Sequence, residues 1–322
     1  MSNILITSGG RRVSLVRAFK KELKKIFKEG KVIVVDASLE LSAAAQIADN
    51  AFKVCKVTDK DYLDQLIKIC IENNVKLIVP TIDTELNILS RKVNEFNKLG
   101  IQIIISNRNI IRACENKMKS KKVFKKMHLN TPKLYSKDNF KLPIFVKPVN
   151  GSGSNDNYVL KKASQISNYH LNNIKLLFFR YIDKNHHDEY TCDAYYDKSG
   201  SLKCIIPRKR IEIRAGEVSK GITKKNKLVD FFKNNASRYE GMRGCITIQC
   251  FMHRKTDRII GIEINPRFGG GFPLSYLAGG NYPKWIIQEY LLGEEIPYYD
   301  DWENNLLMLR YDDEILVHDY RD

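Results

Sequence analysis

The sequence lacks any apolar stretch close to the roughly 20 residues that a membrane-spanning helix needs. Its seven cysteines are odd in number and include no CxxC pair, so neither a disulfide framework nor a zinc knuckle is indicated. The N-terminus also lacks the basic, apolar and small-residue order of a secretory signal. These absences predict a cytoplasmic protein without a membrane segment, in which most cysteines are buried thiols.

Two common nucleotide-binding signatures are missing as well. The chain has neither the GxxxxGK(S/T) loop nor the GxGxxG run of a dinucleotide site. The turn Ser8–Arg12 is only superficially like the second of these, and Asp36 is not by itself evidence of ribose binding. We therefore expect no NAD.

Acidic residues are scarce relative to basic ones, since 37 Asp and Glu against 54 Lys and Arg give a formal net charge of +17. Clustered cations can indicate a nucleic-acid partner, which a steep salt dependence of DNA or RNA affinity would reveal. The lysines are instead spread along predicted helical faces such as Lys20–Lys28, which is typical of a solvated surface. We expect no nucleic-acid partner, and the same positive field suits a small anionic substrate.

The apolar fraction of 43% in 322 residues is enough for two or three packed subdomains. In the first third, short apolar strands alternate with helical periodicity, which predicts a doubly wound parallel sheet at residues 1–107. The expected strands are Asn3–Thr7, Lys31–Val35, Lys76–Val79 and Gln102–Ile105, and the expected helices are Val13–Phe27, Leu63–Ile71 and Glu85–Leu99.

After a lysine-rich helix at Asn116–Met127, which stops before Pro132, the strands become short and are separated by turns. This pattern indicates an antiparallel α+β region with a small lobe at residues 108–182 and a large lobe with a C-terminal extension at residues 183–322. The expected strands are Ile144–Val146, Tyr158–Leu160, Leu176–Tyr181, Tyr190–Tyr195 and Leu202–Ile206.

A late hairpin carries the clearest candidate for a metal site. Strands Ile246–Phe251 and Ile259–Ile264 flank a polar turn. The two-residue period places Gly261, Glu263 and Asn265 on one face, and a turn centred on Thr256 places Gln249 opposite Glu263. Carboxylate and amide oxygens are suited to Mg²⁺, although an exposed polar strand face is the alternative. Arg267 and three glycines follow, so a charged fork and a flexible backbone come next to the metal ligands.

A second candidate feature is Lys147 at the end of an apolar strand, followed by the small polar loop Gly151–Ser154. Such a loop can direct backbone N–H groups at a polyphosphate, and a plain hairpin turn is the alternative. Further along, Glu189 comes at the start of a strand whose first residues are polar, and its carboxylate could hold ribose hydroxyls. An exposed carboxylate on an edge strand is the simpler interpretation.

The order of these features resembles the ATP-grasp superfamily, specifically its carbamoyl-phosphate-synthase-like members. The resemblance covers essentially the whole chain and implies an α/β N-terminal Rossmann-like (pre-ATP-grasp) domain followed by a two-lobed α+β ATP-grasp domain. It rests on Lys117, Lys147, the Gly151–Ser154 loop, Phe179–Ile182, Glu189, Gln249, Glu263, Asn265 and Arg267.

The resemblance also implies a role for each of these residues. Lys117 and Lys147 would contact nucleotide phosphates, and Gly151, Ser152, Gly153 and Ser154 would cover them. Backbone atoms of Arg180 and Ile182, beside Tyr181, would meet adenine, and Glu189 would bind ribose. Glu263 and Asn265, with Gln249, would hold Mg²⁺ or Mn²⁺, and Arg267 would steady the transferred phosphoryl group. Arg210 and Arg214 lie in a segment that looks like the acceptor side of such ligases, and their planar forks suit a carboxylate or acyl phosphate; a solvent-facing basic strand is the alternative.

The expected reaction joins a small-molecule carboxylate to an amine through an acyl phosphate, with ATP converted to ADP and phosphate. One alternative keeps the nucleotide site but forms carboxy or carbamoyl phosphate from bicarbonate. Another is a nucleotide-binding protein without turnover. A homodimer is one possible assembly.

Overall fold

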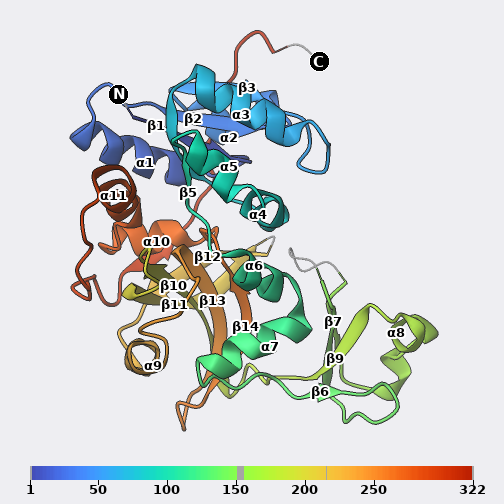
Figure 1. The fold of residues 1–322 in the computed structure, drawn as a ribbon. Coiled ribbons are helices and arrows are strands. Elements are labelled where there is room, and N and C mark those ends of the chain that lie inside the picture. Colours follow the sequence, from blue (N-terminus) through green and yellow to red (C-terminus); the bar gives the residue numbers. More distant parts are fainter. Residues whose placement is uncertain (1, 151–155, 215, 321–322) are drawn as a thin grey trace.

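The computed structural model describes residues 2–150, 156–214 and 216–320, so the predicted phosphate loop Gly151–Ser154 lies outside the described residues. A parallel α/β domain comes first and two antiparallel sheets follow, which confirms the predicted fold class (Figure 1). None of the helices within the described residues is long and apolar enough to cross a membrane.

The N-terminal domain is a five-stranded parallel sheet in the order β3-β2-β1-β4-β5. Because β1 is central and its two neighbours follow it in the chain, the loops at the carboxyl ends of β1 and β4 meet at one edge, where open sheets bind ligands. The strands are β1 (Asn3–Thr7), β2 (Val32–Asp36), β3 (Asn50–Lys53), β4 (Val75–Val79) and β5 (Gln102–Ile103), and the helices are α1 (Val13–Ile26), α2 (Ala43–Gln46), α3 (Tyr62–Glu72), α4 (Asp83–Ser90) and α5 (Val93–Lys98).

The helix expected at Glu85–Leu99 is two helices in the structure, α4 and α5. The hydroxyl of Ser90 donates to the carbonyl of Asn87 at 2.8 Å. Such local bonds compete with the helical ladder, and α4 ends at this residue.

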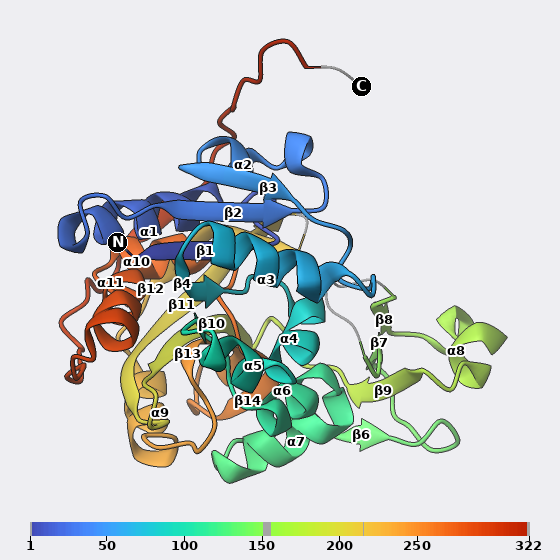
Figure 2. The ribbon, with the colours of Figure 1, turned by 45° about the horizontal axis from the view of Figure 1, so that its top comes forward.

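The small sheet has the antiparallel order β6-β9-β7-β8 and its own compact apolar core. Together with α8 (Asn168–Asn172) it projects to one side of the other two units (Figure 2). The core faces away from Lys147, which lies on the opposite face of β7 beside Phe145 and Phe179. The strands are β6 (Leu134–Tyr135), β7 (Ile144–Pro148), β8 (Tyr158–Leu160) and β9 (Leu176–Arg180).

The large sheet has the order β14-β13-β10-β11-β12-β15 and is antiparallel throughout. Its strands are β10 (His187–Tyr196), β11 (Leu202–Arg214), β12 (Glu217–Thr223), β13 (Gly244–His253), β14 (Ile259–Asn265) and β15 (Leu307–Leu309). The associated helices are α6 (Arg108–Glu115), α7 (Lys117–Lys126), α9 (Lys227–Asn235), α10 (Phe272–Leu277) and α11 (Tyr282–Ile287). Although we grouped residues 108–127 with the small lobe, Ile110, Val123 and Phe124 pack in the core of the large sheet.

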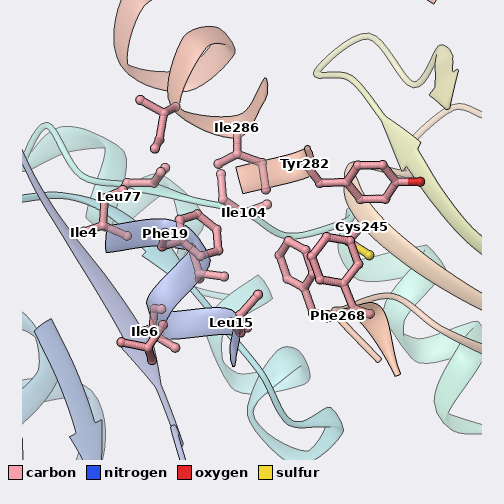
Figure 3. Packing of buried hydrophobic residues seen from close by; sticks show 14 of the residues in the cluster. Ile4, Ile6, Leu15, Phe19, Leu77, Ile104, Cys245, Phe268, Tyr282 and Ile286 are labelled. Carbon is pink, nitrogen blue, oxygen red and sulfur yellow. The ribbon is translucent and has the colours of Figure 1, made fainter. Parts of the chain in front are cut away.

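One continuous apolar core joins the N-terminal domain to the large sheet (Figure 3). Phe19 of α1 packs edge-on against Phe268, with ring centroids 5.9 Å apart, and Cys245 and Tyr282 complete the contact from the large-sheet side. Because Phe268 directly follows Arg267, this core holds Arg267 in a defined position relative to the N-terminal domain.

Candidate active site

A cleft of about 840 Å³ opens where all three units meet. Its lining comes from the carboxyl edge of the N-terminal sheet, from α7, from the small sheet and from one face of the large sheet. It includes most of the predicted site residues: Lys117, Lys147, Arg180, Tyr181, Ile182, Glu189, Arg210, Gln249, Glu263, Asn265 and Arg267. Residues that are up to 150 positions apart in the sequence therefore share one cavity.

Glu263 and Gln249 lie directly opposite each other on β14 and β13, as predicted. Thr247 pairs with Asn265 one step along the same face. Glu263, Asn265 and Gln249 are half-buried and line the cleft, so one carboxylate and two amides face the same space. No group of three His, Cys, Asp or Glu able to hold a metal occurs in the described part of the chain, so the candidate metal ligands are one carboxylate and two amides rather than an acidic cluster.

The pairing arises in a different way from the one we expected. Near the turn, Met252 pairs with Ile259 and Cys250 with Gly261, so the hairpin is centred before Thr256. A β-bulge at Ile262 then restores the Gln249–Glu263 register. The bulge also overturns the expectation that Gly261 shares a face with Glu263, because Gly261 faces α7.

Gly261 is expected to be intolerant of a side chain. A Cβ at this position would lie 2.6 Å from the Phe124 ring and 2.8 Å from Leu129. We predict that Gly261→Val destabilises the fold by about 1–3 kcal/mol through overpacking, measured by urea denaturation. Phe124→Leu in the Gly261→Val background should recover part of the loss; additive effects of the two changes would contradict this explanation.

Lys147 is buried at the cleft wall, with its Nζ 5.1 Å from the centroid of the Phe179 ring. Burial lowers the pKa of Lys147 to about 8; the charge of Lys117 adds to the shift and Glu263 opposes it. Lys117 begins α7, where its N–H donates to the Val149 carbonyl, and burial also lowers its pKa. Two desolvated ammonium groups beside one carboxylate form a site that a polyanion would stabilise.

At the other end of the cleft, Glu189 lies 3.2 Å from Arg210 and 3.3 Å from Lys184 in two ion pairs. Arg210 therefore lies next to Glu189, the predicted ribose-binding residue, and not next to Arg267. The Nε of Arg210 is buried and has no hydrogen-bond partner among the described residues. The N–H groups of Arg180 and Tyr181 already donate to the carbonyls of Lys133 and Pro143.

Arg267 binds Asp83 of the N-terminal domain with two parallel hydrogen bonds, Nε–Oδ1 at 3.0 Å and Nη2–Oδ2 at 2.5 Å. Its Nη1 donates to the Phe268 carbonyl at 3.0 Å. A guanidinium has five N–H donors, so two remain for a ligand in the cleft. Glu85 lies behind this wall, fully buried and accepting from Thr81 and Ile82, which is a structural rather than a ligand-facing position.

The glycine run after Arg267 has a more specific function than flexibility. A side chain at Gly269 would press on Thr247, and one at Gly270 or Gly271 would overlap Glu217 or Arg208 unless those side chains moved. The absence of side chains therefore lets three polar groups reach the backbone of this turn.

Arg214 does not join the cleft. It is exposed and paired with Asp312, on the side of β11 away from Ile213, which does line the cleft. The pairing of β11 with β12 shifts register twice here, between Arg210 and Glu212 and again between Glu212 and Ile213. The first shift adds a residue to β11 and reverses its alternation of faces. Arg210 and Arg214 share a face in the sequence pattern but not in the sheet.

Arg12 and Arg208 were missed as cleft residues, and the pairing of Asp83 with Arg267 was not predicted. Arg208 precedes Arg210 by two residues, so strand periodicity could have placed it on the same face. Arg12 immediately precedes α1 and Asp83 begins α4, both at the sheet edge, and no local pattern predicts their distance to the large lobe.

Two family models match the chain. The model described as "PylC-like, N-terminal domain" covers residues 4–104, and the model described as "ATP-grasp in the biosynthetic pathway with Ter operon" covers residues 175–312. Residues 175–312 therefore match an ATP-grasp family, in agreement with the resemblance read from the sequence. No curated protein matches the sequence.

Solved structures share this ATP-grasp fold at low sequence identity. The biotin carboxylase domain of Hydrogenobacter thermophilus 2-oxoglutarate carboxylase, in complex with MgADP, ADP and bicarbonate, is similar with a TM-score of 0.73 and 17% identity over 94% of this chain and 73% of that one. Staphylococcus aureus N5-carboxyaminoimidazole synthetase in complex with ADP is similar with a TM-score of 0.68 and 16% identity. That match covers 96% of this chain and 80% of the synthetase chain. Rhizobium etli pyruvate carboxylase is similar with a TM-score of 0.72 and 14% identity. The match covers 95% of this chain but only 30% of that protein.

Proposed function

We propose that the protein is an ATP-dependent ligase that joins a carboxylate to an amine, with MgATP converted to ADP and phosphate. The observation that best supports this proposal is that Lys117 and Lys147, two desolvated cations from different units, share one cleft with the oxygen-bearing side chains of β13 and β14. The N5-carboxyaminoimidazole synthetase, which shares the fold, was solved with ADP, and this supports a nucleotide as ligand.

Each part of the cleft suits one part of the nucleotide. Lys117 and Lys147 would neutralise its phosphates, and Gly151–Ser154 would cover them. Glu263, Asn265 and Gln249 would hold Mg²⁺ or Mn²⁺, which supplies charge neutralisation at the phosphate oxygens. Peptide groups of Arg180–Ile182 would contact adenine, and Glu189 would bind ribose while keeping its ion pair with Arg210.

The proposed chemistry needs no side-chain nucleophile. An oxygen of the substrate carboxylate attacks the γ-phosphorus, the bond to the β–γ bridging oxygen breaks, and ADP leaves. The amine then attacks the carbon of the acyl phosphate, phosphate leaves with the C–O electron pair, and the amine loses a proton. Arg267, held by Asp83, directs its two remaining N–H donors at the charge that develops in the first step.

Formation of carboxy phosphate from bicarbonate is the second candidate, favoured by the bicarbonate found with the 2-oxoglutarate carboxylase domain. The test is a screen for ADP release over paired carboxylates and amines, with bicarbonate as a separate donor. Release that requires both an organic acid and an amine supports ligation, whereas release with bicarbonate alone supports the second candidate. MgATP binding without ADP release from any pair would indicate a binding protein instead.

The lowered pKa of Lys147 leads to a pH prediction. Below pH 8 the ammonium is charged and attracts phosphate; above pH 8 it loses its proton, and nucleotide binding must restore it. We expect the Kd of a magnesium-bound, nonhydrolysable ATP analogue to rise about tenfold from pH 7 to pH 9 by calorimetry. Lys147→Arg should flatten this dependence because arginine stays charged. An unchanged slope in Lys147→Arg would assign the titration to another group.

A further inference from the structure

The end of the cleft between the N-terminal domain and the large sheet contains more guanidinium groups than the nucleotide needs. Arg12 and Arg208 line it together with Arg267. Arg208 lies on β11 in the same cross-strand row as Thr191, Gln249 and Glu263, so it is three strands away from the metal-facing carboxylate. Adjacent strands are about 4.8 Å apart, which puts about 14 Å between the two backbones.

Arg208 is buried but only partly satisfied. Its Nε and Nη2 donate to Asp193 at 2.8 and 3.1 Å, and Asp193 also accepts from Ser275 at 2.6 Å. These bonds lock the orientation of the guanidinium. Its Nη1 has no hydrogen-bond partner among the described residues, although the side chain is only 2% exposed. This Nη1 lies against Gly271. Leaving a buried charged donor without an acceptor costs free energy, which an anion that reached it would recover.

Arg12, which lines the same cleft, is a second cation with few hydrogen bonds. Its guanidinium donates one hydrogen bond within the described residues, to the Thr81 carbonyl at 3.4 Å, and no carboxylate is within ion-pair distance. Burial, with the charge of Arg267, lowers the pKa of Arg12 to about 10. Of the nearby acids, Asp83 is committed to Arg267, and Glu217 lies 3.0 Å from Arg310 and 3.6 Å from Arg11.

The glycine turn lies against Arg208 and against an acid that acts on Arg12. Glu217, whose charge acts on Arg12, packs against Gly270, and Arg208 packs against the next residue, Gly271. Arg208 therefore touches this turn directly, whereas Arg12 is linked to it only through the charge of Glu217.

We propose that Arg12 and Arg208 bind a second anionic group, a carboxylate or phosphate, on one of the two substrates, at a distance from the group that reacts. This rests on the proposed ligase function and narrows its substrate class: one substrate is an acid or amine that carries an additional anion. Arg12 and Arg208 are then specificity determinants, while Arg267 serves the transferred phosphoryl group.

The first experiment measures binding without turnover. Glutarate and inorganic phosphate are titrated by calorimetry into protein saturated with Mg²⁺ and a nonhydrolysable ATP analogue, which occupies the γ-phosphate position. Wild type should bind one equivalent of at least one probe. Arg12→Gln should weaken it at least tenfold, Arg12→Lys should keep most of the affinity, and Arg17→Gln on the exposed face of α1 should change nothing.

Equal affinity in wild type and Arg12→Gln, or no binding of either probe, would overturn the proposal. If the ATP analogue itself does not bind, the ligase function fails separately, and the same titrations on nucleotide-free protein still test the anion site. With an active substrate pair, Arg12→Gln should raise KM for one substrate at least tenfold and leave KM for ATP unchanged. A substrate analogue with an amide in place of the additional anionic group should have the same KM with wild type and Arg12→Gln. The substrate for which this holds, carboxylate donor or amine acceptor, is the one that carries the anion.

Discussion

Glu263→Gln is expected to lower kcat by about 10³-fold, which corresponds to a loss of about 4 kcal/mol of transition-state stabilisation. Glutamine keeps the size and the hydrogen-bonding oxygen but removes the only negative charge among the three proposed metal ligands. Lys117 and Lys147 also lose the carboxylate that now opposes the lowering of their pKa values. Initial rates of ADP release at saturating ATP, measured over a magnesium titration, provide the test.

The matched control is Glu212→Gln, an exposed carboxylate on β11 outside the cleft lining. It should retain wild-type activity, and both variants should keep the wild-type thermal midpoint because neither residue is a core group. If Glu263→Gln retained turnover and its magnesium dependence, the metal assignment would be wrong.

Arg267→Lys should reduce kcat by at least about 10³-fold with little change in KM for ATP. Lysine keeps the charge but cannot bind Asp83 with two parallel hydrogen bonds and still direct two donors into the cleft. Asp83→Asn keeps Arg267 but loosens its anchor, so a smaller loss of roughly tenfold is expected. Single-turnover measurement of ADP formation separates this step from product release.

A purely structural function for Arg267 makes the opposite prediction. The pair bridges the N-terminal domain and the large sheet, so Arg267→Lys would then lower the thermal midpoint while kcat held. Arg112→Lys, at an exposed position on α6, controls for the substitution itself.

Much of the chain could be predicted because local patterns reflect local forces. Alternating apolar strands and helices in the first third indicated the parallel sheet, and two-residue alternation indicated the late hairpin. The side chains of Gln249 and Glu263 met as expected, yet only because a bulge at Ile262 compensated for a turn centred elsewhere. A similar bulge on β11 moved Arg214 out of the cleft while leaving Arg210 in it. Single-residue bulges have little signature in the sequence, and each one exchanges the faces of every residue beyond it.

The amino-acid sequence by itself determined the element types, the α/β-then-α+β order and the family resemblance, because these follow from periodicity and from the order of chemically distinctive residues. Only the tertiary structure decided that Asp83 anchors Arg267, that Arg208 is locked by Asp193 and that Arg12 lines the same cleft. Those contacts join residues 15 to more than 180 positions apart. They depend on how the shared core docks the N-terminal sheet edge onto the large sheet, which no local pattern encodes.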